Sequence, residues 1–190
     1  MGKWLFLVLV VALPVTAIGA IYLDEGFEGS WPPAGWYWNI SGSGGGGSWS
    51  QTTGPWGNCA QGRAAANVNY GVGVRLYSAV LAVTTPVTVY YRFDYDWYRY
   101  GTTGSCYFYF YIVRNGSPLF SRTLPVGGWY VYSGSYTLTQ TGEYRLHWVA
   151  AAVGTANQWM FAYIDNVMVA DAPFTAAAPT SLGRVKTLFN

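Results

Sequence analysis

The sequence has very few charged residues. Lys, Arg, Asp and Glu make up 9% of the 190 residues, whereas aromatic residues make up 19% and glycine occurs 24 times. Ten basic and eight acidic residues leave a formal net charge of +2, so the charge does not point to a nucleic acid or an anionic membrane surface as the partner. A chain this rich in aromatic residues is also unlike a disordered one.

Histidine and cysteine are almost absent. His147 is the single histidine, and no strand–turn–helix nucleophile motif accompanies it. One histidine and two cysteines are too few ligands for a structural zinc site, and they argue against a metallohydrolase. We therefore expect no catalytic residue. In an oxidising compartment Cys59 and Cys106 can form one disulfide, which we expect here; two buried free thiols are the alternative.

A long apolar run is missing beyond the first residues. Lys3 is followed by an apolar stretch over 4–13, then by Pro14 and small residues at Ala17 and Ala20. This pattern predicts a cleaved signal peptide, since a membrane-spanning helix needs about 20 apolar residues. We expect a signal peptide at 1–20, one domain at 21–171, and a linker with a C-terminal tail at 172–190. The protein is then secreted or on the cell surface, with no membrane span after cleavage.

The sequence also lacks helical periodicity; instead, apolar residues alternate with mixed ones. Over 88–100 apolar and mixed residues alternate, and the same happens over 106–113, which predicts strands with one buried face. We expect these two strands to form an antiparallel hairpin. About nine or ten such strands indicate an all-β antiparallel jelly-roll sandwich. The Gly/Ser-rich segment 41–50 reads as a flexible surface loop, with Trp49 and Trp56 as candidate contacts at the rim of a site.

The hairpin suggests a ligand-binding face. Tyrosine rings beside charged groups suit sugars, because ring faces stack on C–H groups while the polar groups bond to hydroxyls. Such a face also suits a protein partner, and a tyrosine ladder can simply stabilise a sheet. The candidate ligand-binding residues are Tyr107, Tyr109 and Tyr111 on one strand, with Tyr90, Asp94, Asp96 and Tyr98 on the other.

Asp94 and Asp96 are also the one plausible pair of catalytic carboxylates. Two residues apart on a strand, their Cα atoms lie about 6.5–7 Å apart, a spacing compatible with glycoside hydrolysis. Such pairs usually come from different strands, however, and Arg92 and Arg99 are near enough to pair with them. A glycan-active hydrolase is therefore the least favoured function.

Two motifs carry a family resemblance. The opening F-E-G-S-W-P-P-A-G-W at 27–36 and the closing Y-I-D-N-V at 163–167 resemble the start and end of the bacterial choice-of-anchor J, or cleaved-adhesin, domains. These are MAM-like jelly rolls. The resemblance covers about 23–170 and implies an extracellular adhesion module.

The resemblance also implies a structural calcium ion. In similar domains, acidic residues from the first and last strands bind it, and the matching positions here are Glu28 and Asp165. Glu25 or Asp24 could add a carboxylate, and Asn166 stands where many relatives have a second Asp. Hard oxygen ligands suit Ca²⁺; the alternative is that these acids are solvated edge charges.

The sequence thus predicts an exported, non-catalytic adhesion or binding module. Its expected partner is an extracellular glycan or a surface protein, and carbohydrate binding is the activity that the tyrosine face suggests. The first alternative is a structural subunit of an extracellular matrix or fibre that self-associates, with the tail over 181–190 docking onto a neighbour. A frayed terminus is the other interpretation of that tail.

Overall fold

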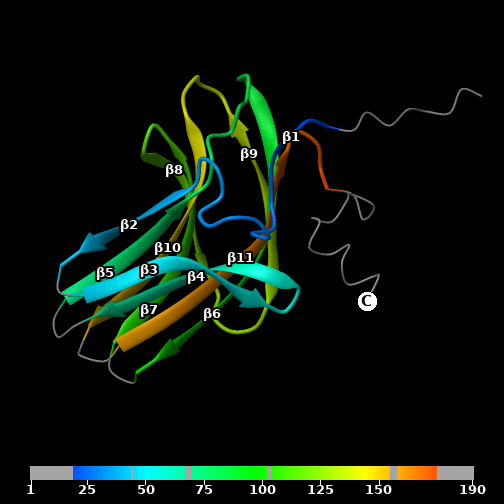
Figure 1. The fold of residues 1–190 in the computed structure, drawn as a ribbon. Coiled ribbons are helices and arrows are strands. Elements are labelled where there is room, and N and C mark those ends of the chain that lie inside the picture. The colour runs from blue at the N-terminus through cyan, green and yellow to red at the C-terminus, as the bar shows by residue number, and fades with distance from the viewer. Residues whose placement is uncertain (1–18, 44, 67–69, 102–103, 155–157, 175–190) are drawn as a thin grey trace, which may run out of the picture.

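The computed structural model describes residues 19–43, 45–66, 70–101, 104–154 and 158–174. Over these residues the chain forms eleven strands in two antiparallel sheets that face each other (Figure 1). The predicted all-β sandwich is confirmed, with slightly more strands than expected. The predicted signal peptide lies outside the described residues except for Gly19 and Ala20, and so does the tail from 175 onward. The described part of the chain contains no helix long and apolar enough to cross a membrane.

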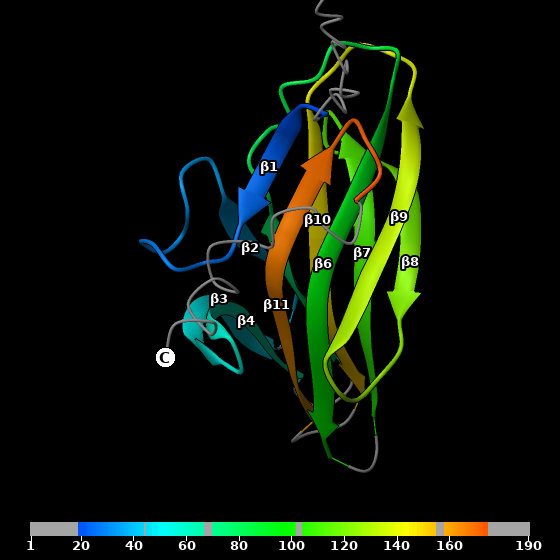
Figure 2. The same cartoon turned by 90° about the vertical axis from the view of Figure 1, so that its right-hand side faces the viewer.

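The first sheet is built around the last strand. Its order is β3-β4-β11-β6-β9, and β1 also pairs with β11. The strand β4 runs along the first half of β11 and β1 runs along the second half, so the two ends of the domain lie side by side (Figure 2). The strands of this first sheet are β1 (Ile21–Glu25), β3 (Gly45–Gly54), β4 (Gly57–Ala66), β6 (Val87–Tyr100), β9 (Tyr130–Leu138) and β11 (Gln158–Ala170).

The second sheet has the order β2-β5-β10-β7-β8, with β10 at its centre. Its inner face packs against the first sheet, and its outer face carries the candidate site described below. The strands of this second sheet are β2 (Tyr37–Gly42), β5 (Tyr70–Tyr77), β7 (Ser105–Arg114), β8 (Ser117–Leu124) and β10 (Tyr144–Gly154).

Alternation predicted the buried faces of β6 and β7 correctly. Every second residue over 89–97 of β6 and 106–112 of β7 points into the core and is at most 6% exposed; these residues are Val89, Tyr91, Phe93, Tyr95, Trp97, Cys106, Phe108, Phe110 and Ile112. The predicted hairpin, however, is wrong. The strand β6 pairs with β11 and β9, whereas β7 pairs with β10 and β8. The chain crosses from one sheet to the other between them, so their apolar faces meet across the core.

The Gly/Ser-rich segment is also not the loop that composition suggested. It contributes to β2 and to β3, which pairs with β4 over its whole length. A Cβ added at Gly47 would lie 2.2 Å from the Arg63 carbonyl oxygen and 2.3 Å from Val74. The bare backbone therefore lets β3 approach β5 of the facing sheet. Trp49, expected at a rim, is 1% exposed in the core and donates from Nε1 to the Val74 carbonyl at 3.0 Å.

This close packing gives a matched pair of substitutions. Gly47→Ala should lower the free energy of unfolding by about 1–3 kcal/mol, because the new methyl group overpacks the contact between the sheets. Gly46→Ala is the control, since nothing lies within 4 Å of a Cβ added there; it should change stability by no more than about 0.5 kcal/mol. Urea denaturation followed by tryptophan fluorescence measures both. Equal effects at the two positions would contradict this account of β3.

The opening stretch carries the chain from β1 of the first sheet to β2 of the second, and Phe27 is not in a strand. β1 ends at Glu25, and Phe27 adopts a left-handed conformation with φ of 54°. Its buried ring contacts Trp31 and Trp36 at centroid distances of 6.0 and 5.2 Å. Trp36 in turn stacks on Trp148 of β10 at 5.8 Å, so the crossing segment is fixed by aromatic packing.

The predicted disulfide is not formed: Cys59 and Cys106 are both buried free thiols. Cys59 follows Gly57 and Asn58 on β4 and is level with Asp165, because its neighbour Ala60 pairs with Ile164. Cys106 is level with Gln158, whose Nε2 donates to its sulfur at 3.0 Å. Asp165 and Gln158 are seven positions apart on β11, which places the two cysteines roughly 20 Å apart along the strand direction. A disulfide needs Cα atoms within about 7 Å of each other.

Candidate functional site

The outer face of the second sheet carries a row of aromatic rings. Tyr107, Tyr109 and Tyr111 point outward there, because their neighbours on β7 point into the core. The row continues across three more strands through His147 of β10, Tyr77 of β5 and Tyr37 of β2. Centroids of successive rings lie 4.2–6.0 Å apart. The sheet therefore presents a continuous aromatic band that crosses its strands.

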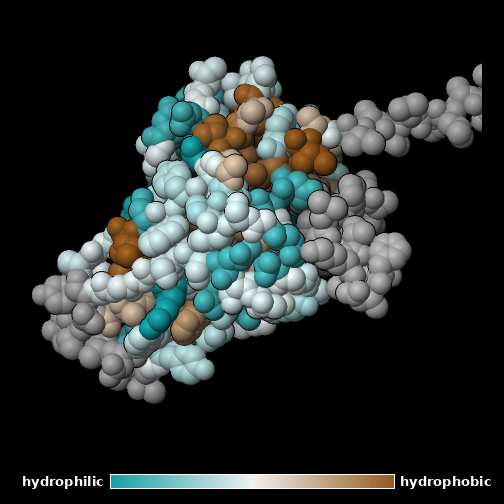
Figure 3. Space-filling model, viewed as in Figure 1, coloured by the Kyte–Doolittle hydropathy of each residue, from teal (hydrophilic) through white to brown (hydrophobic). Residues whose placement is uncertain are grey.

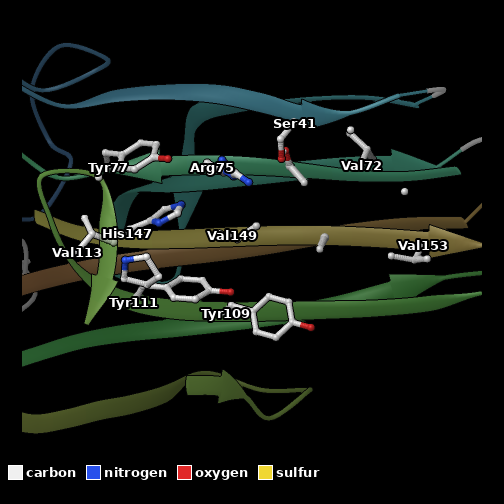
Figure 4. A pocket seen from close by; sticks show the side chains of 16 residues that line it. Ser41, Val72, Arg75, Tyr77, Tyr109, Tyr111, Val113, His147, Val149 and Val153 are labelled. Carbon is white, nitrogen blue, oxygen red and sulfur yellow. The ribbon is translucent and has the colours of Figure 1, made fainter. Parts of the chain in front are cut away.

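A groove of about 530 Å³ runs over the same face. It is hollow because Gly71, Gly73 and Ala151 leave little side-chain volume between the larger residues of β5 and β10. Arg75, His147 and Tyr111 lie side by side across β5, β10 and β7 in this groove (Figure 4). Its size falls in the range of about 300–1,000 Å³ that is usual for small-molecule sites.

Two polar groups in the groove have no hydrogen-bond partner among the residues that the structure describes. Arg75 makes no hydrogen bond or ion pair with any described residue, and its Nε atom is buried. His147 is 8% exposed, and its buried Nε2 also lacks a partner. Because buried polar groups in folded proteins are nearly always hydrogen-bonded, such exceptions mark places where a ligand can supply the missing partner.

Burial keeps His147 neutral. Desolvation, with a further contribution from the Arg75 guanidinium, lowers the pKa of His147 to about 3. Stacked between Tyr77 and Tyr111 at 4.2 and 5.2 Å, the uncharged imidazole is part of the aromatic band. Burial also raises the pKa values of Tyr109 and Tyr111, so their hydroxyls stay protonated. The groove therefore offers flat rings, neutral hydroxyls and one cation.

A second hollow, of about 620 Å³, shares Tyr109 and Tyr111 with the groove. It lies over β8, the edge strand of this sheet, and Ser121, Arg122 and Thr123 contribute to its lining. The binding surface therefore extends across β7 on both sides, which leaves room for an elongated ligand.

The structure divides the predicted ligand-binding residues between two sheets. The three tyrosines of β7 are in the aromatic band, and Tyr109 and Tyr111 line the groove, but Tyr90, Asp94, Asp96 and Tyr98 lie on the outer face of β6 in the opposite sheet. The expectation that they share one face is wrong, because it rested on the hairpin. Asp94 is 1% exposed and its Oδ2 accepts a hydrogen bond from Asn166 at 2.8 Å, which does not suit a carboxylate that must reach a substrate.

Sequence reasoning missed four residues of the site: Tyr37, Arg75, Tyr77 and His147. On β5, Gly71, Gly73, Arg75 and Tyr77 alternate with buried residues. This period of two is the signal that could have identified Arg75 and Tyr77 from the sequence. His147 is accompanied by no motif in the sequence, and the structure places its ring inside the aromatic band.

The acidic residues implied by the family resemblance meet at the junction of β1 and β11. Asp165 pairs directly with Asp94 across the sheet. Burial raises the pKa of Asp165 to about 7, opposed by the Asn166 backbone N–H and reinforced by the charges of Asp94, Glu28 and Glu25. Three other carboxyl groups are therefore close enough to Asp165 to repel its charge.

Hydrogen bonds hold this acidic junction together. The Glu25 carboxylate accepts from the Phe27 N–H at 2.6 Å, and that of Glu28 accepts from the Asn58 N–H at 3.2 Å. The side-chain amide of Asn166 donates to both Asp94 and Asp165. One oxygen of Asp94 is buried without a partner. Among the residues that the structure describes, no group of three or more His, Cys, Asp or Glu side chains is arranged to hold a metal ion.

Trp56, the other expected rim residue, lies on the first sheet. It is half-buried and packs edge-on against Trp129 at 5.3 Å. The view of the face bearing the β3–β4 hairpin shows hydrophobic residues gathered near β1 and over β2, with neutral and hydrophilic residues between them (Figure 3).

No protein-family model matches the chain, and neither does any curated protein. Solved structures share its fold. The family 11 carbohydrate-binding module of a cellulosomal cellulase from Clostridium thermocellum superposes with a TM-score of 0.51 at 14% identity, covering 83% of this chain and 98% of the module. The CBM22-1 xylan-binding domain of a Paenibacillus barcinonensis protein gives 0.50 at 15% identity, covering 83% and 97%. At these identities the likeness establishes a jelly-roll sandwich and no more.

Proposed function

We propose that the protein is an exported, non-catalytic carbohydrate-binding module, and that the groove on the second sheet is its glycan site. The observation that carries this proposal is the unpartnered Arg75 guanidinium beside a continuous aromatic band. Pyranose rings present C–H faces that stack on such rings, and their hydroxyls accept hydrogen bonds from a guanidinium. A neutral polysaccharide also suits a chain with so little charge.

The fold supports the same proposal. Two structures with this sandwich are carbohydrate-binding modules by description, one of them xylan-binding. The resemblance to choice-of-anchor J domains points to the same extracellular setting, and Glu28 and Asp165, one from each of its motifs, lie close enough for their charges to interact. A surface-protein partner and self-association into a fibre remain the competing proposals. A module that elutes as a monomer and is retained by a polysaccharide would favour glycan binding over both.

Affinity electrophoresis through gels that contain xylan, mixed-linkage β-glucan or galactan tests the glycan site. We expect at least one polysaccharide to retard the protein. The double substitution Tyr109→Ala and Tyr111→Ala should weaken that retardation by about tenfold or more, because each stacked ring contributes about 1 kcal/mol or more. Tyr130→Ala on β9, where the ring is 48% exposed, is the control and should migrate like the unmodified protein. Equal retardation of all three proteins would contradict the assignment of this groove.

We further propose that the acidic junction binds a structural Ca²⁺ through Glu25, Glu28 and Asp165, with Asp94 as an added ligand. What supports this is the unpartnered buried oxygen of Asp94 and the mutual repulsion of the carboxylates around Asp165. A cation would neutralise that repulsion and tie the segment after β1 to β6 and β11. Oxygen ligands of this kind suit calcium.

Removing calcium is therefore expected to lower the melting temperature. If the ion is present at about 100 times its dissociation constant, it stabilises the fold by about 2.7 kcal/mol. At about 2–4 °C per kcal/mol for a domain of this size, the shift is roughly 5–10 °C. Differential scanning calorimetry with calcium and with a chelator measures it. Asp165→Asn should abolish the difference between the two conditions. An unmodified protein that melts at the same temperature with and without calcium would rule the ion out.

A further inference from the structure

The outer face of the first sheet carries a second aromatic surface, on the opposite side of the sandwich from the groove. It is distinct from the glycan site because the whole core separates the two faces (Figure 2). Its rings come from β6, from β11, from the β3–β4 turn and from the segment that leads into β9. The members of this surface are Tyr98, Tyr100, Phe161, Tyr163, Trp56 and Trp129.

The rings form one connected cluster. Tyr98 stacks on Phe161 at 5.4 Å and on Tyr163 at 5.9 Å, with interplanar angles of 28° in both cases. Trp129 lies 6.1 Å from Tyr163. Tyr98 remains 37% exposed, so this cluster faces solvent and is not part of the core.

A recess of about 370 Å³ opens at one end of this cluster. Tyr98, Tyr163 and Trp129 line it, and Thr53 and Pro55 of the β3–β4 turn form its rim. Its volume is within the range of about 300–1,000 Å³ for small-molecule sites. Flat rings therefore form the wall of a concave site.

Asp96 is the polar group of the recess. It lies directly across the sheet from Tyr163. Its carboxylate makes no hydrogen bond or ion pair with any residue in the described ranges, and its Oδ1 is buried. A partly buried carboxylate that accepts no hydrogen bond is destabilising. A ligand that donates a hydrogen bond to Asp96 would therefore remove that cost.

The remaining polar groups of the recess are hydroxyls. The Tyr98 and Tyr163 hydroxyls lie 2.9 Å apart and share a hydrogen bond, and the Gln61 amide donates to Tyr163 at 2.8 Å. At the other end of the surface the Arg63 guanidinium lies 4.1 Å from the centre of the Trp159 ring. Rings, hydroxyls and one hydrogen-bond acceptor match a neutral polyol, and because a carboxylate beside aromatic rings also suits a cation, a cationic probe is the comparison that the test needs.

From this arrangement we propose that the recess around Asp96, Tyr98, Tyr163 and Trp129 is a second, independent sugar-binding site. Asp96 accepts hydrogen bonds from the sugar hydroxyls, and the Trp129 and Tyr98 rings provide the apolar contact. With one site on each sheet, a single module holds two glycan chains at once and cross-links them. The proposed second site shares no residue with the groove, so this proposal does not depend on the proposed function.

Two-dimensional ¹H–¹⁵N NMR of the domain tests the proposal, because the indole N–H of Trp129 reports on the recess and the backbone amides of Tyr111 and His147 report on the groove. The probes are xylohexaose, a mixed-linkage β-glucan tetrasaccharide and β-1,4-galactotriose, with tetramethylammonium chloride as the cationic comparison. We expect a sugar to shift the Trp129 signal. Asp96→Asn should weaken that shift about tenfold, as expected for the loss of a charged hydrogen-bond acceptor, and should leave the groove signals unchanged.

The reciprocal variant separates this proposal from the proposed function. In Tyr111→Ala the groove signals should stop responding while the Trp129 signal still shifts. A Trp129 signal that responds to no sugar, or responds only to tetramethylammonium, would overturn the second site even if the groove binds. If Trp129 alone responds, the second site stands and the groove assignment fails. Loss of the Trp129 response in Tyr111→Ala would mean one site and would also overturn the proposal.

Discussion

Replacing Arg75 by Ala should weaken polysaccharide binding by about 10- to 100-fold while leaving the fold at least as stable as before. A hydrogen bond to a charged group contributes about 1.5–3 kcal/mol, which corresponds to that loss of affinity. The free energy of unfolding should not fall, because Arg75 makes no hydrogen bond or ion pair with a described residue and its Nε is buried without a partner. Affinity electrophoresis and thermal denaturation of the same preparation measure the two effects.

The conservative variant makes this test sharper. Arg75→Lys keeps the positive charge but loses the planar fork of donors, so it should bind with an affinity between those of the unmodified protein and Arg75→Ala. An Arg75→Ala protein that melts at a clearly lower temperature would instead show that this side chain serves the fold. Unchanged shifts of the groove amide signals when Arg75→Ala is titrated with the sugar would show that the guanidinium does not contact the glycan, because retention alone also reports on the second site.

Trp148→Ala should destabilise the fold strongly, by about 3–5 kcal/mol. Trp148 is fully buried at the centre of the second sheet and stacks on Trp36 at 5.8 Å. It also contacts Phe93 of the facing sheet edge-on at 5.3 Å and Phe110 at 5.6 Å. Its removal opens a cavity between the sheets and removes the ring on which Trp36, in the segment between β1 and β2, is stacked. Chemical denaturation gives the free energy of unfolding directly.

Two companion variants identify the cause of that loss. Trp38→Ala on the edge strand β2, where the side chain is 37% exposed, should cost about 1 kcal/mol or less. Trp148→Phe should cost less than Trp148→Ala, because it keeps a ring and removes an indole N–H that has no partner. If the alanine variants at 38 and 148 lost equal stability, Trp148 would not be the centre of the core.

The sequence predicted inward and outward faces well because alternation is a local property of a strand. It identified the buried residues of β6 and β7 and the outward tyrosines of β7. It could not assign the strands to sheets, since that depends on contacts between distant segments. The glycines of β3 illustrate the same limit, because a run of glycine has the same composition in a loop as in a strand that packs closely on another sheet.

Only the tyrosines of β7 were predicted from the sequence as part of this site, for a related physical reason. Its rings on β7 were recognisable as a set of tyrosines, but the importance of Arg75 and His147 lies in the partners that they lack in the folded chain. Composition cannot reveal an unpaired group. The proximity of Asp165 to Asp94 was likewise hidden, whereas a position of Asp165 near Glu25 and Glu28 was implied by the family resemblance.

The most direct test of the central claim is a crystal structure of the domain with an oligosaccharide that it retains. The account predicts sugar rings stacked on Tyr109 and Tyr111, with hydroxyl groups hydrogen-bonded to the Arg75 guanidinium in the groove of the second sheet. A sugar bound only elsewhere on the molecule, with Arg75 still without a partner, would contradict it.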